Sequence, residues 1–291
     1  MSRYKTSYGL ALCRYNYQEN NRIEILSIKK RFTYYYFIFV HGFYKSRSLR
    51  NNDIGYIKYL FDNMSFEEKL IILSRNYGNM WWYIWLNNPE KGIDIFDQSK
   101  LLNNKMENGK VPYYVGQNEE KEIIQSVCDY SKYFKKKNKF EKKFLLDGGK
   151  RLAEIINNSK NCEAIWEIPK GGKDTKETDL DTAIREFTEE TEISSKYYNI
   201  LYHINPVILT YKDNGVIYRH IYYLAELNKE GYNEYKIMKP KVNFKSCKQL
   251  SEVADINWLS LAHINLLNLP NKNKKNMLKL YGDIIRKYKK V

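Results

Sequence analysis

The segment WEIPKGGKDTKETDLDTAIREFTEET, residues 166–191, constrains the fold of this 291-residue chain more than any other part of it. Its apolar start ends at Pro169 and two glycines, which predicts a strand that closes in a tight turn. Thr178 or Asp179 can then cap a helix that runs to about Thr191. Apolar residues at helical spacing would dock this helix on a sheet. We therefore expect a strand–turn–helix unit within an α+β domain.

Carboxylates are concentrated in this helix. Eight acids and three bases between Gly171 and Ile193 give the segment a charge of −5, in a chain of formal net charge +15. Glu186, Glu189 and Glu190 lie at i, i+3 and i+4 and so project from one side of the helix. Such like charges destabilise a helix by about 0.2–0.5 kcal/mol per pair. A solvated acidic face is one interpretation; the other is a site for Mg²⁺ or Mn²⁺, which prefer oxygen ligands. The Gly171 carbonyl would add a ligand.

The spacing around these glutamates forms a longer pattern. Arg185, inside the helix, can be held by Glu177 in the preceding loop. Read from Gly171, the order is Gly, five residues, Glu177, seven residues and REFTEETEI, residues 185–193. This resembles the Nudix box, G-x5-E-x7-R-E-U-x-E-E-x-G-U, where U is aliphatic or aromatic. Only Glu192 departs, where the family has a glycine that eases a left-handed helix end. The departure concerns the turn and not the metal ligands.

The resemblance extends beyond the box. The stretch WEIPKG resembles the strand and turn that lead into the box of mRNA-decapping Nudix enzymes. Over most of its length the chain also resembles decapping Nudix hydrolases of large DNA viruses, in the stretches KTSYGLALCR, NMWWYIW, TAIREFTEET and YRHIYYLA. It implies a Nudix β-α-β sandwich with an inserted all-helical domain. It also implies two or three Mg²⁺ or Mn²⁺ ions, held by Glu186, Glu189, Glu190 and the Gly171 carbonyl, with Glu189 or Glu190 taking the proton of the attacking water. Capped RNA would give 7-methyl-GDP and RNA with a 5′-monophosphate, in the host cytoplasm if the chain is viral.

Two further residues are candidates for this site. Lys170 is expected to touch a phosphate. Glu252, before a late strand, is a candidate distant base or metal ligand, with an exposed surface glutamate as the alternative.

Hydrophobic periodicity predicts the domain limits. Alternating residues favour strands over 6–15 and 22–31, whereas from about His41 the pattern becomes helical, with a capping box at Ser65 and Glu68. Strands return later, with a hairpin turn at Asn214-Gly215, and a basic amphipathic helix over 272–290 is expected to dock on the body. We therefore expect a Nudix domain over 1–40 and 148–291 and the inserted helical domain over 41–147.

The charge outside the acidic segment is +20, which favours polyanionic partners. A lysine-rich stretch with interleaved Phe134, Phe140 and Phe144 is a candidate RNA-binding surface; a solvated face is the alternative. Its lysines are Lys132, Lys135, Lys136, Lys137, Lys139, Lys142 and Lys143.

Other sequence features narrow the class of protein. The four cysteines form no CxxC pair, the four histidines have no metal-ligand spacing, and no apolar run is long enough to span a membrane. We therefore expect a cytoplasmic protein, with a possible homodimer through the tryptophans of residues 80–86. Hydrolysis of diphosphoinositol polyphosphates and RNA binding with an idle Nudix site remain as alternatives. A nucleotide-pool hydrolase would not need a charge of +15.

Overall fold

The computed structural model describes residues 3–16, 22–45, 53–85, 130–213, 215–235, 240–243, 246, 249 and 252–289. The chain divides into two compact units. The first comprises Met1–Arg31, Ile165–Asn243 and Glu252–Val291, and the second comprises Phe32–Ala164 and Phe244–Ser251. The turn residue Asn214 lies outside the described residues.

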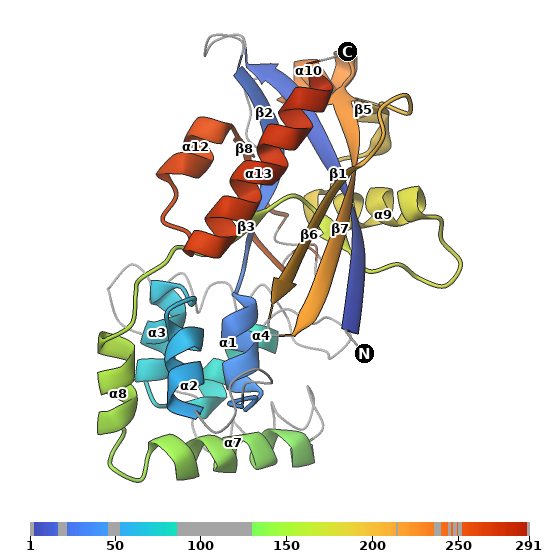
Figure 1. Ribbon diagram of the computed structural model, residues 1–291. Coiled ribbons are helices and arrows are strands. Elements are labelled where there is room, and N and C mark those ends of the chain that lie inside the picture. The colour runs from blue at the N-terminus through green and yellow to red at the C-terminus, as the bar shows by residue number, and fades with distance from the viewer. Residues whose placement is uncertain are drawn as a thin grey trace. The chain divides into compact units, whose positions relative to one another are not determined.

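The first unit is built on a mixed sheet, whose long β1 (Arg3–Asn16) runs parallel to β7 (Val216–Leu227) (Figure 1). The other pairs among the described strands are antiparallel. Strand β2 pairs with β1, β3 and β8; β4 pairs with β1; β5 and β6 pair with β7. The remaining strands are β2 (Arg22–Lys30), β3 (Trp166–Glu167), β4 (Lys170–Gly171), β5 (Tyr198–Ile200), β6 (Val207–Asp213) and β8 (Val253–Leu259).

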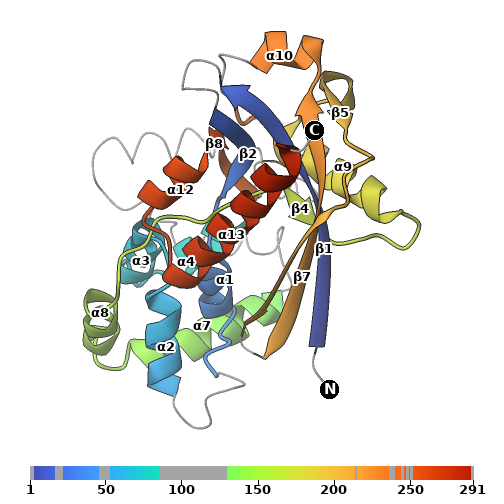
Figure 2. The ribbon, with the colours of Figure 1, turned by 45° about the horizontal axis from the view of Figure 1, so that its top comes forward.

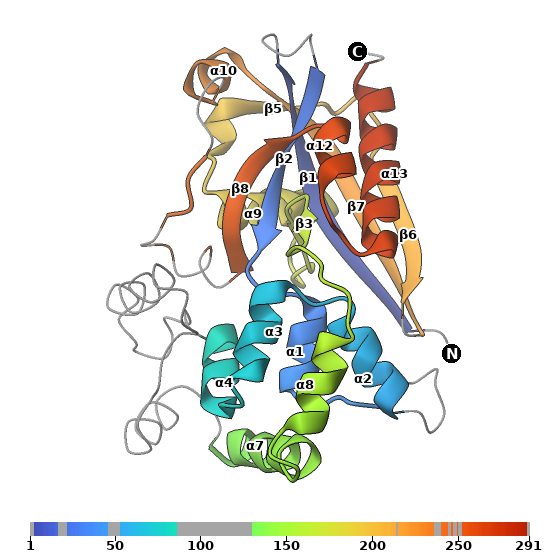
Figure 3. The same cartoon turned by 90° about the vertical axis from the view of Figure 1, so that its left-hand side faces the viewer.

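Helices cover both faces of this sheet, because its central strands bury side chains on both sides. Leu10 and Leu12 of β1 pack with Phe187 of α9 (Asp179–Thr191), whereas Ala11 and Cys13 face the cluster that contains Tyr281 of α13 (Asn271–Tyr288). Figures 2 and 3 show α9 and α13 on opposite sides of the sheet. The docking predicted for the C-terminal helix is thus confirmed. Smaller elements are η3 (Ser195–Tyr197), α10 (Lys229–Tyr235) and α12 (Leu261–Leu266).

The second unit is helical in its described residues, apart from an isolated bridge between Ser65 and Cys162. An aromatic core holds it together, with Phe39 packed against Phe61, Phe140 and Phe144. The predicted capping box at Ser65 and Glu68 is present. No helix in the described part of the chain is long and apolar enough to span a bilayer. The helices are α1 (Tyr34–Val40), α2 (Asp53–Phe61), α3 (Phe66–Leu73), α4 (Tyr77–Trp85), α7 (Tyr130–Phe144) and α8 (Lys150–Asn157).

The limits of the two units differ from the expected residues 40 and 147. The aromatic run of α1 favours a strand by propensity, but Thr33 caps a helix there by accepting a hydrogen bond from the backbone N–H of Tyr36. Most of α1 is then buried against α2 and α4. Helix α8 packs on α2 and α3, so it also belongs to the helical unit. Tertiary packing thus places the limits at 31 and 164.

The tryptophans of α4 give no direct support for a dimer. Trp81 and Ile84 are buried, and Trp81 contacts the rings of His41, Tyr77 and Tyr133 within the same unit. The side chains of the other tryptophans of this helix lie outside the described residues. The homodimer stays a prediction.

Candidate active site

The helix α9 carries the acidic residues and is fixed at both ends. Thr178 and Asp181 form a capping box at its N-terminus. Glu192 ends it in the left-handed conformation, with φ of 57° and ψ of 16°. The turn geometry that glycine would favour is therefore kept by a glutamate, whose Oε2 accepts a hydrogen bond of 2.7 Å from Asn243 Nδ2. The departure from the box pattern at this position does not displace the helix end.

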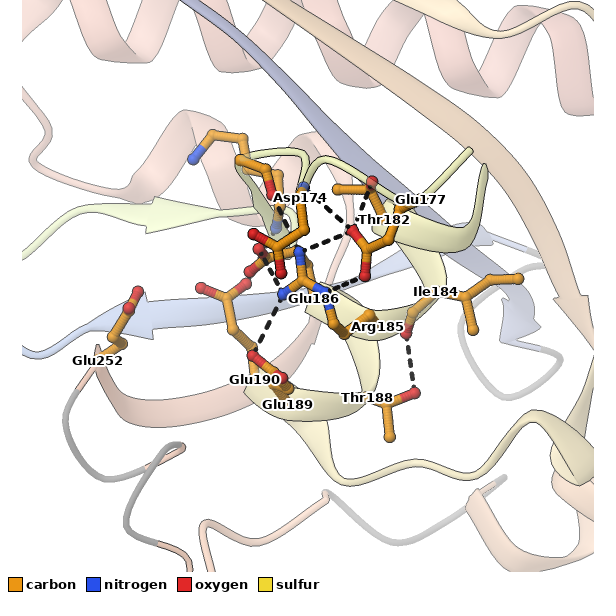
Figure 4. A network of polar contacts seen from close by, with 12 residues as sticks. Asp174, Glu177, Thr182, Ile184, Arg185, Glu186, Thr188, Glu189, Glu190 and Glu252 are labelled. Atoms are coloured by element: carbon orange, nitrogen blue, oxygen red, sulfur yellow. Dashed lines mark hydrogen bonds and ion pairs between the residues drawn. The ribbon is translucent and has the colours of Figure 1, made fainter. Parts of the chain in front are cut away.

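Arg185 is the centre of a polar network that joins the loop to the helix (Figure 4). Its Nε and one terminal nitrogen donate to the two oxygens of Glu177, at 2.6 and 3.1 Å. The same nitrogen donates to the Gly172 carbonyl at 2.9 Å, and the other donates to Glu186 at 2.9 Å and Glu189 at 3.4 Å. The hydrogen bond from Arg185 lowers the pKa of Glu177 to about 2. The guanidinium thus orients Glu186 and Glu189 while it holds the preceding loop.

Glu190 is the most buried of the three glutamates, with 4% of its surface exposed. One carboxylate oxygen accepts from the backbone N–H of Lys170 and the other from Lys30 Nζ, each at 2.9 Å. Burial raises the pKa of Glu190 to about 7, against the opposing effect of the Lys30 charge. The strand β4 and the helix α9 are therefore linked at the carboxylate itself.

Gly171 allows the closest approach between β4 and α9. A Cβ atom at this position would overlap the carboxyl group of Glu186. Burial raises the pKa of Glu186, and the negative charges of Glu189 and Glu252 contribute to the increase. Figure 4 shows Glu252 facing the glutamates of α9. Carboxylates from α9 and from the segment before β8 thus act on the Glu186 carboxyl group, which lies beside the Gly171 backbone.

Lys30, at the end of β2, is a site residue that sequence reasoning missed. Its Nζ lies 2.9 Å from Glu190, 2.7 Å from Glu252 and 3.5 Å from Glu167. Burial lowers the pKa of Lys30, but these carboxylates outweigh that effect and hold it well above its usual value. Pairing of β2 with β3 and β8 creates this cluster. Lys30 lies outside every motif considered, and only the strand alternation could have marked it as inward-facing.

The glutamates of α9 supply the donor set that a hard cation needs, but they are not preassembled. Among the described residues, no group of three or more His, Cys, Asp or Glu side chains is arranged to hold a metal ion. Arg185 holds Glu186 and Glu189 whereas Lys30 holds Glu190, and the shared metal site of the three glutamates stays a prediction. Their oxygen donors, with the backbone of Gly171 in close approach, still fit Mg²⁺ or Mn²⁺ chemistry.

Lys170 is turned toward Glu167. Its Nζ lies 2.7 Å from Glu167 Oε2, and its side chain is 15% exposed. The charge expected to meet a phosphate is thus partly neutralised within the protein. Glu252 has a side chain that is 58% exposed and that pairs with Lys30, and its role as a distant base or metal ligand stays a prediction.

Six of the seven lysines of α7 fall into two groups. Lys136 and Lys139 donate at 2.5 Å to the carbonyls of His41 and Gly42, and Lys143 pairs with Asp53 at 3.1 Å. Three others, Lys132, Lys135 and Lys142, are exposed. The first group therefore stabilises the helical unit as well as contributing charge.

The aromatics of α7 correct the expected surface. Phe140 and Phe144 are buried in the core, because they lie at i and i+4 on the apolar stripe of the helix. Phe43, on the neighbouring loop, is 53% exposed, and Lys136 Nζ lies 4.5 Å from the centre of its ring. The structure thus pairs the basic helix with an aromatic ring from another segment. Lys137 lies 5.8 Å from the ring of Phe134.

Several known proteins are similar to this chain. Residues 144–281 match the model of the NUDIX domain. The chain is 31% identical to the mRNA-decapping protein g5R of African swine fever virus over 268 residues, 91% of this chain and 88% of the relative. The structure of an Ap4A hydrolase from C. elegans in a binary complex is 21% identical to this chain, with a TM-score of 0.31. The match covers 42% of this chain and 78% of the hydrolase chain.

Proposed function

Since this chain belongs to the Nudix hydrolase family, we propose that it is a metal-dependent mRNA-decapping enzyme. It would hydrolyse the pyrophosphate bond of the cap and release 7-methyl-GDP and RNA with a 5′-monophosphate, acting in the host cytoplasm. The observation that carries the proposal is the close approach of the Glu186 carboxyl group to the backbone of Gly171, where the charges of Glu189 and Glu252 also act on it. The similarity to a viral mRNA-decapping protein supports the choice of substrate.

The glutamates Glu186, Glu189 and Glu190 and the Gly171 carbonyl would hold Mg²⁺ or Mn²⁺. A bound divalent ion supplies neutralisation of the pyrophosphate charge and a lowered pKa for a coordinated water. Arg185 keeps Glu186 and Glu189 oriented, and it ties the Gly172 carbonyl to the same helix.

Proton transfer from the attacking water would fall to Glu189 or Glu190. Glu189 is the more accessible, with 28% of its side chain exposed against 5% for Glu190. Glu252 is the distant alternative, exposed and joined to Glu190 through Lys30. Lys170 would contact a phosphate only if its ammonium group can bind that phosphate and Glu167 at the same time.

The decisive test is incubation of cap-labelled RNA with the protein and Mg²⁺ or Mn²⁺. We expect labelled 7-methyl-GDP, with competition by uncapped RNA. Stronger competition by an inositol pyrophosphate than by uncapped RNA would favour the diphosphoinositol polyphosphate hydrolase instead. A protein that binds the RNA but releases no labelled nucleotide would be an RNA-binding protein with an idle site.

The basic helix α7, together with Phe43, is the proposed RNA surface. We expect Lys135→Glu and Lys142→Glu to weaken binding of uncapped RNA and to reduce its salt dependence by roughly one phosphate contact each. Hydrolysis of a free cap dinucleotide should stay unchanged. Lys150→Glu, an exposed lysine of α8 in the same unit, is the matched control. Equal loss of RNA binding in all three variants would show only a general charge effect.

A further inference from the structure

Lys30 brings together carboxylates that come from three separate elements. Its Nζ contacts Glu190 of α9, Glu252 ahead of β8 and Glu167 of β3, at 2.9, 2.7 and 3.5 Å. The backbone fixes two of these partners, since Glu190 also accepts from the N–H of Lys170, and the Glu252 carbonyl accepts from the N–H of Arg31 at 2.8 Å. The ammonium therefore lies in a site that the sheet builds around it.

This ammonium neutralises carboxylates that would otherwise repel one another. Glu190 is 4% exposed, and an unpaired buried carboxylate is strongly unfavourable. Lys170 provides a second positive charge near this cluster, but its Nζ pairs with Glu167. Glu190 and Glu252 thus have Lys30 as the cation that they share.

We propose that Lys30 is a built-in counter-ion of the metal site, which holds Glu190 and Glu252 together in the metal-free protein and competes with a divalent cation for Glu190. The inference rests on the proposed function, because it takes Glu190 as a metal ligand. Two cations that bind the same carboxylate lie within a few ångströms and repel each other. Lys30 is in this sense a positioning residue: it orders the carboxylates and sets how tightly they bind metal.

The test is direct binding of Mn²⁺ to the full-length protein, measured from the electron paramagnetic resonance signal of free Mn²⁺. We expect Lys30→Met and Lys30→Gln to lower the Kd by about tenfold, which corresponds to about 1.4 kcal/mol. Lys30→Arg keeps the charge and should keep the wild-type Kd. The matched control is Lys29→Met, which removes the same charge from a neighbour that makes no ion pair in the described part of the chain.

A second measurement follows the protein without metal. Lys30→Met should lower the thermal midpoint in the presence of a chelator, and Mn²⁺ should raise that midpoint more in the variant than in the wild type. If Lys30→Met does not fold, the Mn²⁺ affinity of Lys30→Gln tests the proposal instead, because the glutamine amide can still donate a hydrogen bond to Glu190. An unchanged or higher Kd in folded Lys30→Met or Lys30→Gln would refute the counter-ion role.

The two proposals fail in different ways. Absence of Mn²⁺ binding by the wild-type protein, or binding that Glu186→Gln does not weaken, would refute the proposed metal site itself. Wild-type binding and cap hydrolysis, combined with no tightening in Lys30→Met and Lys30→Gln, would refute only the role of Lys30.

Discussion

Replacement of Gly171 by alanine should impair catalysis and leave the fold in place. The added Cβ would overlap the carboxyl group of Glu186. At Gly172, the next residue, a Cβ would meet no atom within 4 Å. The two substitutions add the same methyl group to adjacent positions of one turn, so their difference isolates the position of the Glu186 carboxylate.

The magnitude follows from the required displacement. Ordinary van der Waals contact of a Cβ lies at 3.4–4 Å, so the Glu186 carboxylate must move by about 1 Å or more. A misplacement of about 1 Å can lower a rate by roughly 10²-fold. The overlapping atoms are the far end of a flexible side chain, and we expect the free energy of unfolding to change by less than about 1 kcal/mol.

The assay compares release of labelled 7-methyl-GDP by Gly171→Ala, Gly172→Ala and the wild type, with urea unfolding of each. We expect kcat to fall about 100-fold in Gly171→Ala and to stay close to the wild-type value in Gly172→Ala. Equal activity of the two variants, with both folded, would show that the close approach of Gly171 to Glu186 has no part in catalysis. A large loss of stability in Gly171→Ala would show that the strand β4, and not the carboxylate, yields to the methyl group.

Three further predictions concern single residues. Glu190→Gln should lower cap release by at least about 100-fold while RNA binding persists; unchanged release, measured with cap-labelled RNA, would indicate that the site is idle. Burial lowers the pKa of His220 to about 4, so the unfolded state binds a proton at higher pH than the folded state. The stabilising contribution of neutral His220 is therefore complete above about pH 6.5, and the free energy of unfolding should fall by about 2 kcal/mol between pH 7 and pH 5. Urea unfolding should show this loss in the wild type and a smaller one in His220→Gln; the same loss in both would contradict it. Glu192→Gly should raise the free energy of unfolding by about 0.5 kcal/mol, because it relieves the left-handed strain although it removes the bond from Asn243; a decrease in urea unfolding would show that this bond dominates.

The sequence by itself determined the local structure of the site. The capping residue Thr178, the extent of α9 and the contact between Arg185 and Glu177 all follow from residues within one short segment. Helical spacing and capping act over a few residues, so a pattern in the chain is sufficient to predict them. The docking of α13 was also predictable, because its apolar stripe has one obvious face to bury.

The tertiary structure decided how the charges of the site are shared. Lys30 and Glu190 are 160 residues apart, and sheet pairing brings them within 2.9 Å. The same kind of long-range packing turned the aromatic run of α1 into a helix and directed Phe140 into the core. Local patterns could place three glutamates on one turn of α9 with Arg185 beside two of them. Only packing between distant strands could decide that the ammonium of Lys30 would hold the third. The physical reason is that burial leaves each carboxylate in need of a partner, and the partner is supplied by whichever element the fold brings alongside.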